Sequence, residues 1–359
     1  MNPIHPRPNP IVAAMYTLRD MDVDVIVMHG PSGCGFMASR MLEEAGVRVV
    51  TTGMGDNDLV FGAGESLIRT LRAVSEKFDP RTVAVIGTCA SMIIGEDMGS
   101  SIRRAGIGGN VFPVDCHGCM GDNTLGAAKA MEAGCKAGIV SPEEAERQVR
   151  LMRAATNMEK RDGMASKDYL SPVRGPTKLK VAGTIIDALR NGRTVAVAML
   201  AKKELAYRFA DIFLAVDAAR EELGGDIFFT ANLDTGAGLP RIRRYAIDIT
   251  NELARGNVSM DETIGGLDEY AVVGERMRDA VERNSPDLLV LTGIPHAYPG
   301  YSTNDVLITD PPRQLANYLN AGCSLAVGEI ASHSMVMNTR RIVETETGNT
   351  IRELLRGRP

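Results

Sequence analysis

The stretch VDVIVMHGPSGCGF, residues 23–36, joins an apolar, β-branched run to a glycine-rich turn. The run predicts a buried strand over 23–28, and Gly, Pro and Ser predict a tight turn over 30–35. Helical spacing follows over 36–46, so the stretch is a strand–turn–helix unit. Cys34 stands inside the turn, which is the wrong place for an ordinary core residue.

The same alternation of strands and helices continues along the chain, and such alternation favours parallel, doubly wound sheets. We therefore expect an α/β protein with two Rossmann-like domains, residues 1–165 and 191–359. Polar residues and helix breakers place the linker at 166–190. The last segment, 339–359, predicts a polar helix that could return to the first domain. The expected strands are 23–28, 47–52, 82–87, 110–115, 193–200, 225–231, 270–274, 287–293 and 323–330; the expected helices are 36–46, 64–77, 100–106, 125–134 and one that begins at Ser141 with Glu144 closing a capping box.

Composition and charge exclude several classes of protein. The net charge of −5 over 359 residues gives no reason to expect nucleic acid. No apolar run approaches the roughly 18 residues of a membrane span. The N-terminus, MNPIHPRPNP, is polar and proline-rich and does not resemble a signal peptide, so we expect a cytoplasmic protein. The 19 methionines fit either irregular core packing or a soft pocket for a large flat ligand.

Three cysteines, Cys34, Cys89 and Cys116, each come directly after a predicted strand. Because the carboxyl ends of parallel strands share one edge of a sheet, the three thiols are expected to converge there. Such a set suits a metal or an iron–sulfur cluster, and a cubane cluster suits dispersed ligands best. The alternatives are a zinc site, a redox pair at Cys116-x-x-Cys119, or small buried residues. Cys135 and Cys323 have the sequence context of structural residues.

Three motifs carry a resemblance to a known family: HGPSGCG (29–35), GTCASMIIGED (87–97) and DCHGCMGDN (115–123). They resemble the cysteine motifs of the catalytic component in the nitrogenase superfamily. The segments DNDLVFGAGESL (56–67) and GGLDEYAVVGE (265–275) are also similar to segments of that family. Nitrogenase subunits are substantially longer, and the compact chain is more similar to the catalytic subunits of Ni-sirohydrochlorin a,c-diamide reductive cyclases.

This resemblance implies an enzyme that reduces a nickel tetrapyrrole and closes a γ-lactam on the way to coenzyme F-430. It also implies a homodimer and a 4Fe–4S cluster bound by Cys34, Cys89 and Cys116. Cys119 departs from the family pattern. It could be the fourth ligand of the cluster or a ligand across the dimer interface; alternatively, a carboxylate could be the fourth ligand. The chain lacks the G-x-x-x-x-G-K-[ST] motif, so we expect no ATP site in it. A separate ATP-dependent iron–sulfur reductase would supply the electrons.

Other residues are candidates for handling protons or substrate. His29, His117 and Asp56 could donate protons, and Asp58, Glu96 and Asp97 lie in the same loops. The alternative is a structural role: these six residues could lie in solvated loops, cap helices or form hydrogen bonds to the backbone. Arg241, Arg243 and Arg244 could pair with substrate carboxylates, or could form a solvated helix face. Met54, Met92 and Met120 could pack against the macrocycle. Three other functions stay open: a cluster-assembly scaffold, a zinc or sensor protein, and another nitrogenase-like reductase.

Overall fold

The computed structural model describes residues 9–162, 175–310, 312–329 and 340–357, and these form two compact units. The N-terminal unit contains residues up to Arg153 together with Leu239–Arg241. The C-terminal unit contains the rest of the chain from Ala154. The division falls inside helix α8 (Pro142–Arg161), which therefore contributes to both units.

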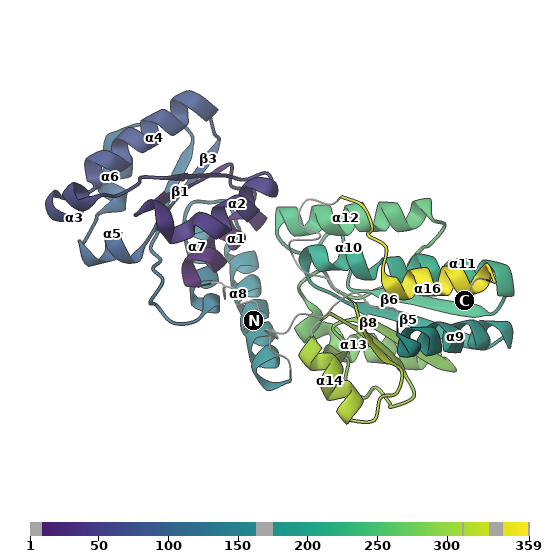
Figure 1. The fold of residues 1–359 in the computed structure, drawn as a ribbon. Helices are drawn as coiled ribbons and strands as arrows, with labels where there is room; N and C mark the ends of the chain where they lie inside the picture. Colours follow the sequence, from purple (N-terminus) through teal and green to yellow (C-terminus); the bar gives the residue numbers. More distant parts are fainter. Residues whose placement is uncertain (1–8, 163–174, 311, 330–339, 358–359) are drawn as a thin grey trace. The chain divides into compact units, whose positions relative to one another are not determined.

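The N-terminal unit is built on a four-stranded parallel sheet in the order β2-β1-β3-β4. All five residues of β1 are buried, so both faces of the sheet are covered. On one face Val25 and Val27 pack with apolar residues of α4, and α6 lies beside α4 (Figure 1). Helices α1 and α7 pack together and contact β3 and β4. The strands are β1 (Val25–His29), β2 (Arg48–Thr51), β3 (Thr82–Gly87) and β4 (Asn110–Val114); the remaining helices are α1 (Pro10–Asp20), α2 (Phe36–Glu44), α3 (Asp56–Phe61), α4 (Gly64–Phe78), α5 (Cys89–Ile93), α6 (Met98–Ala105) and α7 (Asn123–Lys136).

The C-terminal unit contains a six-stranded parallel sheet in the order β10-β9-β8-β5-β6-β7. The order runs outward in one direction from β5 to β7 and in the other from β8 to β10, so the topological switch point lies between β5 and β8. The strands are β5 (Thr194–Leu200), β6 (Asp226–Ala231), β7 (Glu262–Thr263), β8 (Leu288–Gly293), β9 (Val306–Thr309) and β10 (Ala326–Gly328); the helices are α9 (Pro176–Arg190), α10 (Ala206–Phe209), α11 (Asp211–Leu223), α12 (Pro240–Arg255), α13 (Tyr270–Arg283), α14 (Pro312–Asn320) and α16 (Glu346–Leu355).

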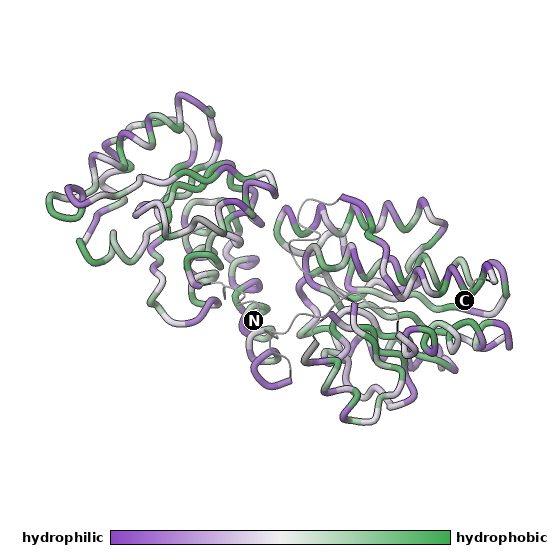
Figure 2. The backbone as a smooth tube through the Cα atoms, viewed as in Figure 1, coloured by the Kyte–Doolittle hydropathy of each residue, from purple (hydrophilic) through white to green (hydrophobic). Residues whose placement is uncertain are grey.

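Both units confirm the expected α/β class with parallel sheets. Figure 2 shows hydrophobic residues gathered along the strands of each sheet. Half of the capping box expected at Ser141 is present, because the Ser141 hydroxyl accepts a hydrogen bond from the Glu144 backbone N–H at 3.2 Å. The Glu144 carboxylate accepts hydrogen bonds from Arg147 and Gln148. None of the helices among the described residues is long and apolar enough to cross a membrane.

The strand expected over 270–274 is wrong, because these residues begin helix α13. The buried side chains of α13 include Tyr270, Val273, Met277 and Ala280, a helical spacing that the five-residue window YAVVG is too short to reveal. Part of the expected linker, 166–190, is helix α9, whose apolar residues are buried in the C-terminal unit. Residues 163–174 of that range lie outside the described residues.

The last helix, α16, packs against α9 and α11 of its own unit. Two buried carboxylates hold its beginning. Glu329 is fully buried and accepts hydrogen bonds from the backbone N–H groups of Glu346 and Thr347 at 3.1 and 2.8 Å. Asp211 accepts from the backbone N–H of Thr345 at 2.7 Å. These contacts satisfy N–H groups that the start of a helix leaves without internal partners.

Candidate functional site

The carboxyl edge of the N-terminal sheet carries the three cysteines that the sequence analysis singled out. Cys34 lies in the turn Ser32–Gly35 after β1, and Cys89 is the first residue of α5 after β3. Cys116 follows β4 and is buried, whereas Cys34 is exposed. Since β1, β3 and β4 are neighbours in the sheet, the topology brings the three positions to one edge.

Two glycines let these strand ends approach each other closely. A Cβ atom on Gly30 would lie 2.4 Å from Thr88 Oγ1, and one on Gly87 would lie 3.0 Å from the Cys116 carbonyl oxygen. Thr88 fills the space beside Gly30 and donates a hydrogen bond from Oγ1 to the His29 carbonyl oxygen at 3.0 Å. Its side chain also caps helix α5, directly before Cys89. Thr88 therefore joins the end of β1 to the turn that presents Cys89.

Cys89 is the centre of the thiol cluster. Its Sγ lies 3.7 Å from Cys119 Sγ and accepts a hydrogen bond from the Gly118 backbone N–H at 3.2 Å. Cys116 Sγ lies 3.5 Å from the sulfur of Met120. Backbone N–H donors to sulfur stabilise thiolate charge, and they are one of the means by which proteins adjust iron–sulfur clusters.

Cys89 contributes to the pKa shift of each of the other three thiols. Burial raises the pKa of Cys34, and the neighbouring Cys89 raises it further. Burial raises the pKa of Cys116 to about 12, with added contributions from Asp115 and Cys89. The contact with Cys89 raises the pKa of Cys119. Without a metal these three thiols are protonated at neutral pH, so binding of a metal would release their protons.

The donors at this edge are thiols, which bind both iron–sulfur clusters and zinc. Among the described residues, no three Cys, His, Asp or Glu side chains stand close enough together to hold one metal ion. A cubane binds each cysteine sulfur at a different iron, so its ligands surround the cluster instead of meeting at a point. The four cysteines lie at this edge, but the sulfurs of Cys89 and Cys119, 3.7 Å apart, are closer than two sulfurs bound to different irons, so they would have to separate for both to bind one cubane.

His29 lies beneath the edge and its side chain is fully buried. Its Nδ1 is 3.2 Å from Thr52 Oγ1, and its Nε2 is 3.5 Å from a carboxylate oxygen of Glu96. Burial lowers the pKa of His29, although Glu96 acts in the opposite direction. The other oxygen of Glu96 accepts a hydrogen bond from the Ala63 backbone N–H. Glu96 therefore connects the buried imidazole to the loop that follows α3.

The other candidate proton donors differ in their surroundings. His117 is half-buried, and its Nδ1 has no hydrogen-bond partner in the part of the chain that the structure describes. Asp56 is exposed at the beginning of α3. Asp58 accepts hydrogen bonds from Ser66 and the Gly55 backbone, and Asp97 caps α6. Those two carboxylates stabilise local structure, which is the structural role that the sequence analysis gave as the alternative to proton donation.

The three candidate arginines stand at the beginning of α12. Arg241 groups with the N-terminal unit, where it donates to the Ala45 carbonyl oxygen at 2.7 Å and lies 3.5 Å from Asp22. Arg243 and Arg244 belong to the C-terminal unit and are exposed. Of the candidate methionines, Met54 is buried, Met92 is exposed and Met120 contacts Cys116.

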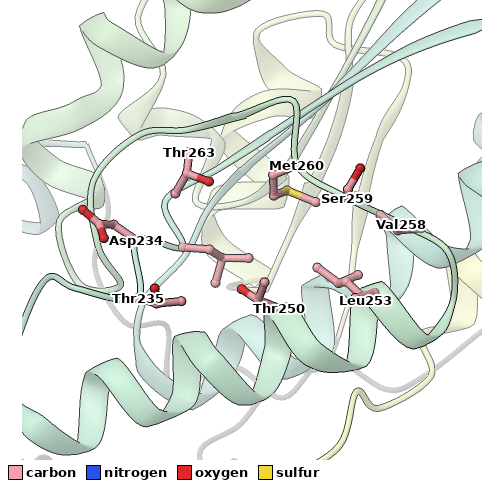
Figure 3. A pocket seen from close by; sticks show the side chains of 10 residues that line it. Asp234, Thr235, Thr250, Leu253, Val258, Ser259, Met260 and Thr263 are labelled. Carbon is pink, nitrogen blue, oxygen red and sulfur yellow. The ribbon is translucent and has the colours of Figure 1, made fainter.

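Sequence reasoning overlooked the residues that position the cysteines. The role of Thr88 has a visible signal, because a threonine between a strand and a helix start is a preferred N-cap. The hydrogen bond from Gly118 to Cys89 has no visible signal in the sequence, because it joins two residues that lie 29 positions apart in the chain. A pocket of about 410 Å³ lies in the C-terminal unit, lined by residues of α12, of the segment after β6 and of the segment that leads into β7. Figure 3 shows these side chains. None of the predicted site residues lines the pocket.

Similarity to known proteins identifies the family of this chain. A family model described as "Nitrogenase component 1 type Oxidoreductase" matches residues 10–215. The chain belongs to this nitrogenase-like family of oxidoreductases. The match covers the whole edge that carries Cys34, Cys89, Cys116 and Cys119. The chain is therefore a nitrogenase-like oxidoreductase, and iron–sulfur binding is a general property of that family.

Three archaeal relatives within this nitrogenase-like family match almost the full chain. Each is named "Ni-sirohydrochlorin a,c-diamide reductive cyclase complex, component CfbD". The relative from Methanothermobacter thermautotrophicus is 43% identical over 97% of this chain and 98% of its own. The relative from Methanosarcina acetivorans is 42% identical over 98% and 97%. The relative from Methanocaldococcus jannaschii is 39% identical over 97% and 98%.

Proposed function

We propose that this chain is the catalytic component of a nitrogenase-like, ATP-dependent reductive cyclase. Its substrate would be Ni-sirohydrochlorin a,c-diamide, and its product the seco precursor of coenzyme F-430, formed by reduction and γ-lactam closure. The observation that carries the proposal is 39–43% identity, over at least 97% of both chains, to three proteins with that printed name. The gathering of the cysteine motifs at one sheet edge supports it independently.

The cofactor of this proposal is a 4Fe–4S cluster held by Cys34, Cys89 and Cys116. Cys119 is the proposed fourth ligand, because it is exposed at the same edge beside Cys89; its sulfur, 3.7 Å from that of Cys89, would move away from Cys89 to bind a different iron. When bound, the cluster supplies single electrons to the substrate. The Gly118 N–H stabilises the charge on Cys89, and the exposed positions of Cys34 and Cys119 leave the site reachable from outside the unit.

The proposed assembly is a homodimer, and an apolar surface close to the cysteines supports it. On α3, Val60 and Phe61 are 72% and 84% exposed, and on α5 Ile93 is 75% exposed. The hydrogen bond between Glu96 and Ala63 ties the segments that follow these two helices together. Exposed apolar patches of this kind mark protein interaction sites. A second copy covering α3 and α5 would also shield a cluster at Cys34 and Cys119 from water.

The proposal includes a second protein, because the chain has no phosphate-binding loop of the G-x-x-x-x-G-K-[ST] type. An ATP-dependent iron–sulfur reductase would deliver the electrons. The relatives' printed names describe a component of a complex, which supports a partner of this kind.

Protons for the reduced ring would come from His117 or Asp56 at the edge, or from His29. His29 is buried, so a proton from it would pass through Glu96, whose carboxylate lies 3.5 Å from the imidazole. Arg243 and Arg244 remain the proposed partners of substrate carboxylates, whereas Arg241 already binds the Ala45 carbonyl and faces Asp22.

The test is an anaerobic turnover assay of the purified chain with its reductase, ATP and Ni-sirohydrochlorin a,c-diamide. The proposal predicts a reduced, lactam-containing product whose formation stops in Cys89→Ala and continues in Cys323→Ala, a buried cysteine of the C-terminal core. An intact cluster without turnover would instead favour a cluster-assembly scaffold. Zinc in place of iron and sulfide would contradict the redox function altogether.

A further inference from the structure

A second group of polar side chains gathers at the carboxyl edge of the C-terminal sheet. Lys202 follows β5 and His296 follows β8. These are the two strands that flank the topological switch point, where open α/β sheets bind their ligands. The edge contains no cysteine of the proposed cluster and none of the candidate residues named from the sequence.

Glu159, on the last turns of α8, lies at the centre of this group. Its Oε1 accepts a hydrogen bond from the Tyr270 hydroxyl at 3.2 Å. The same oxygen lies 3.9 Å from Lys202 Nζ and 3.7 Å from His296 Nε2. Burial pushes the pKa of Glu159 upward, but His296 and Lys202 outweigh it and the net shift is downward. Glu159 is therefore ionised at neutral pH.

Two donors of the group lack close partners. Lys202 makes no hydrogen bond within the described part of the chain; its ammonium stands 5.6 Å from the centre of the Tyr270 ring and 3.9 Å from Glu159. The side chain of His296 is only 6% exposed, yet its buried Nε2 has no hydrogen-bond partner among the described residues. The side chains of Lys202 and Glu159 are 33% and 27% exposed, so a ligand could reach them.

An ammonium and a carboxylate held 3.9 Å apart are too distant for a direct hydrogen bond. A primary carboxamide fits between such a pair, because its oxygen accepts from the ammonium while its neighbouring NH₂ donates to the carboxylate. A carboxylate ligand would gain from Lys202 but would be repelled by Glu159 and has no hydrogen to donate. The pair is thus suited to distinguish an amide from an acid.

We propose that Lys202 and Glu159 bind a primary carboxamide arm of the substrate and reject the corresponding carboxylate. This inference rests on the proposed function, which supplies a diamide substrate. The C-terminal unit would then select the amidated tetrapyrrole over its acid precursor.

The experiment measures binding to the full-length, cluster-loaded chain by spectrophotometric titration. The probes are Ni-sirohydrochlorin a,c-diamide and Ni-sirohydrochlorin, which carries acids in place of both amides. Lys202→Met keeps the length of the side chain and should weaken binding of the diamide about 10- to 100-fold, the range for hydrogen bonds to charged groups. Glu159→Gln removes the negative charge and should reduce the preference for the diamide, because the acid is no longer repelled.

Lys203→Met is the matched control, since Lys203 is the next residue and faces Asp268 instead. It should change neither affinity more than about twofold, within the range of an ordinary surface substitution. Equal changes in the two affinities on Glu159→Gln, or an unchanged diamide affinity in Lys202→Met, would overturn the inference. If the wild-type chain binds neither tetrapyrrole, the proposed function itself fails. The two failures are therefore distinguishable.

Discussion

Replacement of Gly30 by alanine tests whether close packing of strand ends positions the cysteines. The new Cβ would lie 2.4 Å from Oγ1 and 2.5 Å from Cγ2 of Thr88, so Thr88 must move. Overpacking of this kind destabilises by about 1–3 kcal/mol. Displacing Thr88 also weakens its hydrogen bond to His29 and its cap on α5, each worth about 1 kcal/mol. We expect a total loss of about 2–5 kcal/mol in the N-terminal unit.

The assay is a urea titration read by hydrogen–deuterium exchange in peptides that cover β1 and β3. Gly33→Ala is the control in the same turn, because a Cβ there meets no atom within 4 Å and should change stability by less than about 0.5 kcal/mol. Adding Thr88→Ala to Gly30→Ala removes the clashing Oγ1 and Cγ2, so the double variant should be more stable than the sum of the single effects. Equal stability of the Gly30 and Gly33 variants would refute the reasoning.

Three further perturbations test other parts of the structure. Glu329→Gln should lower the free energy of unfolding of the C-terminal unit by about 3–5 kcal/mol in calorimetry, because it disrupts the hydrogen bonds of a fully buried carboxylate; Glu221→Gln, at an exposed position of α11, should have little effect. Phe61→Ser should convert a dimer to monomers in sedimentation, whereas Val272→Ser, an exposed apolar change in the other unit, should not. Because burial lowers the pKa of His29, the unfolded chain gains a proton first, so stability should fall as pH drops below about 6.5; an equal slope in His29→Gln would contradict this.

The sequence was sufficient to place the three cysteines because each follows a predicted strand, and the strands before Cys34 and Cys89 are buried on both faces. A near-continuous apolar run such as 82–87 clearly predicts a buried strand. In a parallel sheet the carboxyl ends of the strands then lie at one edge. The convergence of Cys34, Cys89 and Cys116 follows from that topology alone.

The features that the sequence did not predict correctly have a short local pattern or depend on contacts between residues far apart in the chain. The window YAVVG is β-branched, and only the later Met277 and Ala280 reveal the helix. The two-residue strand β7 exists because β6 pairs with it, which no local pattern shows. The hydrogen bonds from the start of α16 to the buried carboxylates of Asp211 and Glu329 join residues far apart in the chain, and no local pattern shows them. The Lys202–Glu159 pair joins residues 43 positions apart and left no motif in the sequence.

The most direct test of the central claim is iron and sulfide analysis of the anaerobically purified chain, with electron paramagnetic resonance of the reduced protein. We predict four irons and four sulfides per cluster, as the 4Fe–4S type requires. Single alanine replacement of Cys34, Cys89 or Cys116 should remove the iron and the signal, whereas replacement of Cys135 or Cys323 should retain both. Retention of the cluster after all three of the first replacements would contradict the assignment of this sheet edge as the metal centre.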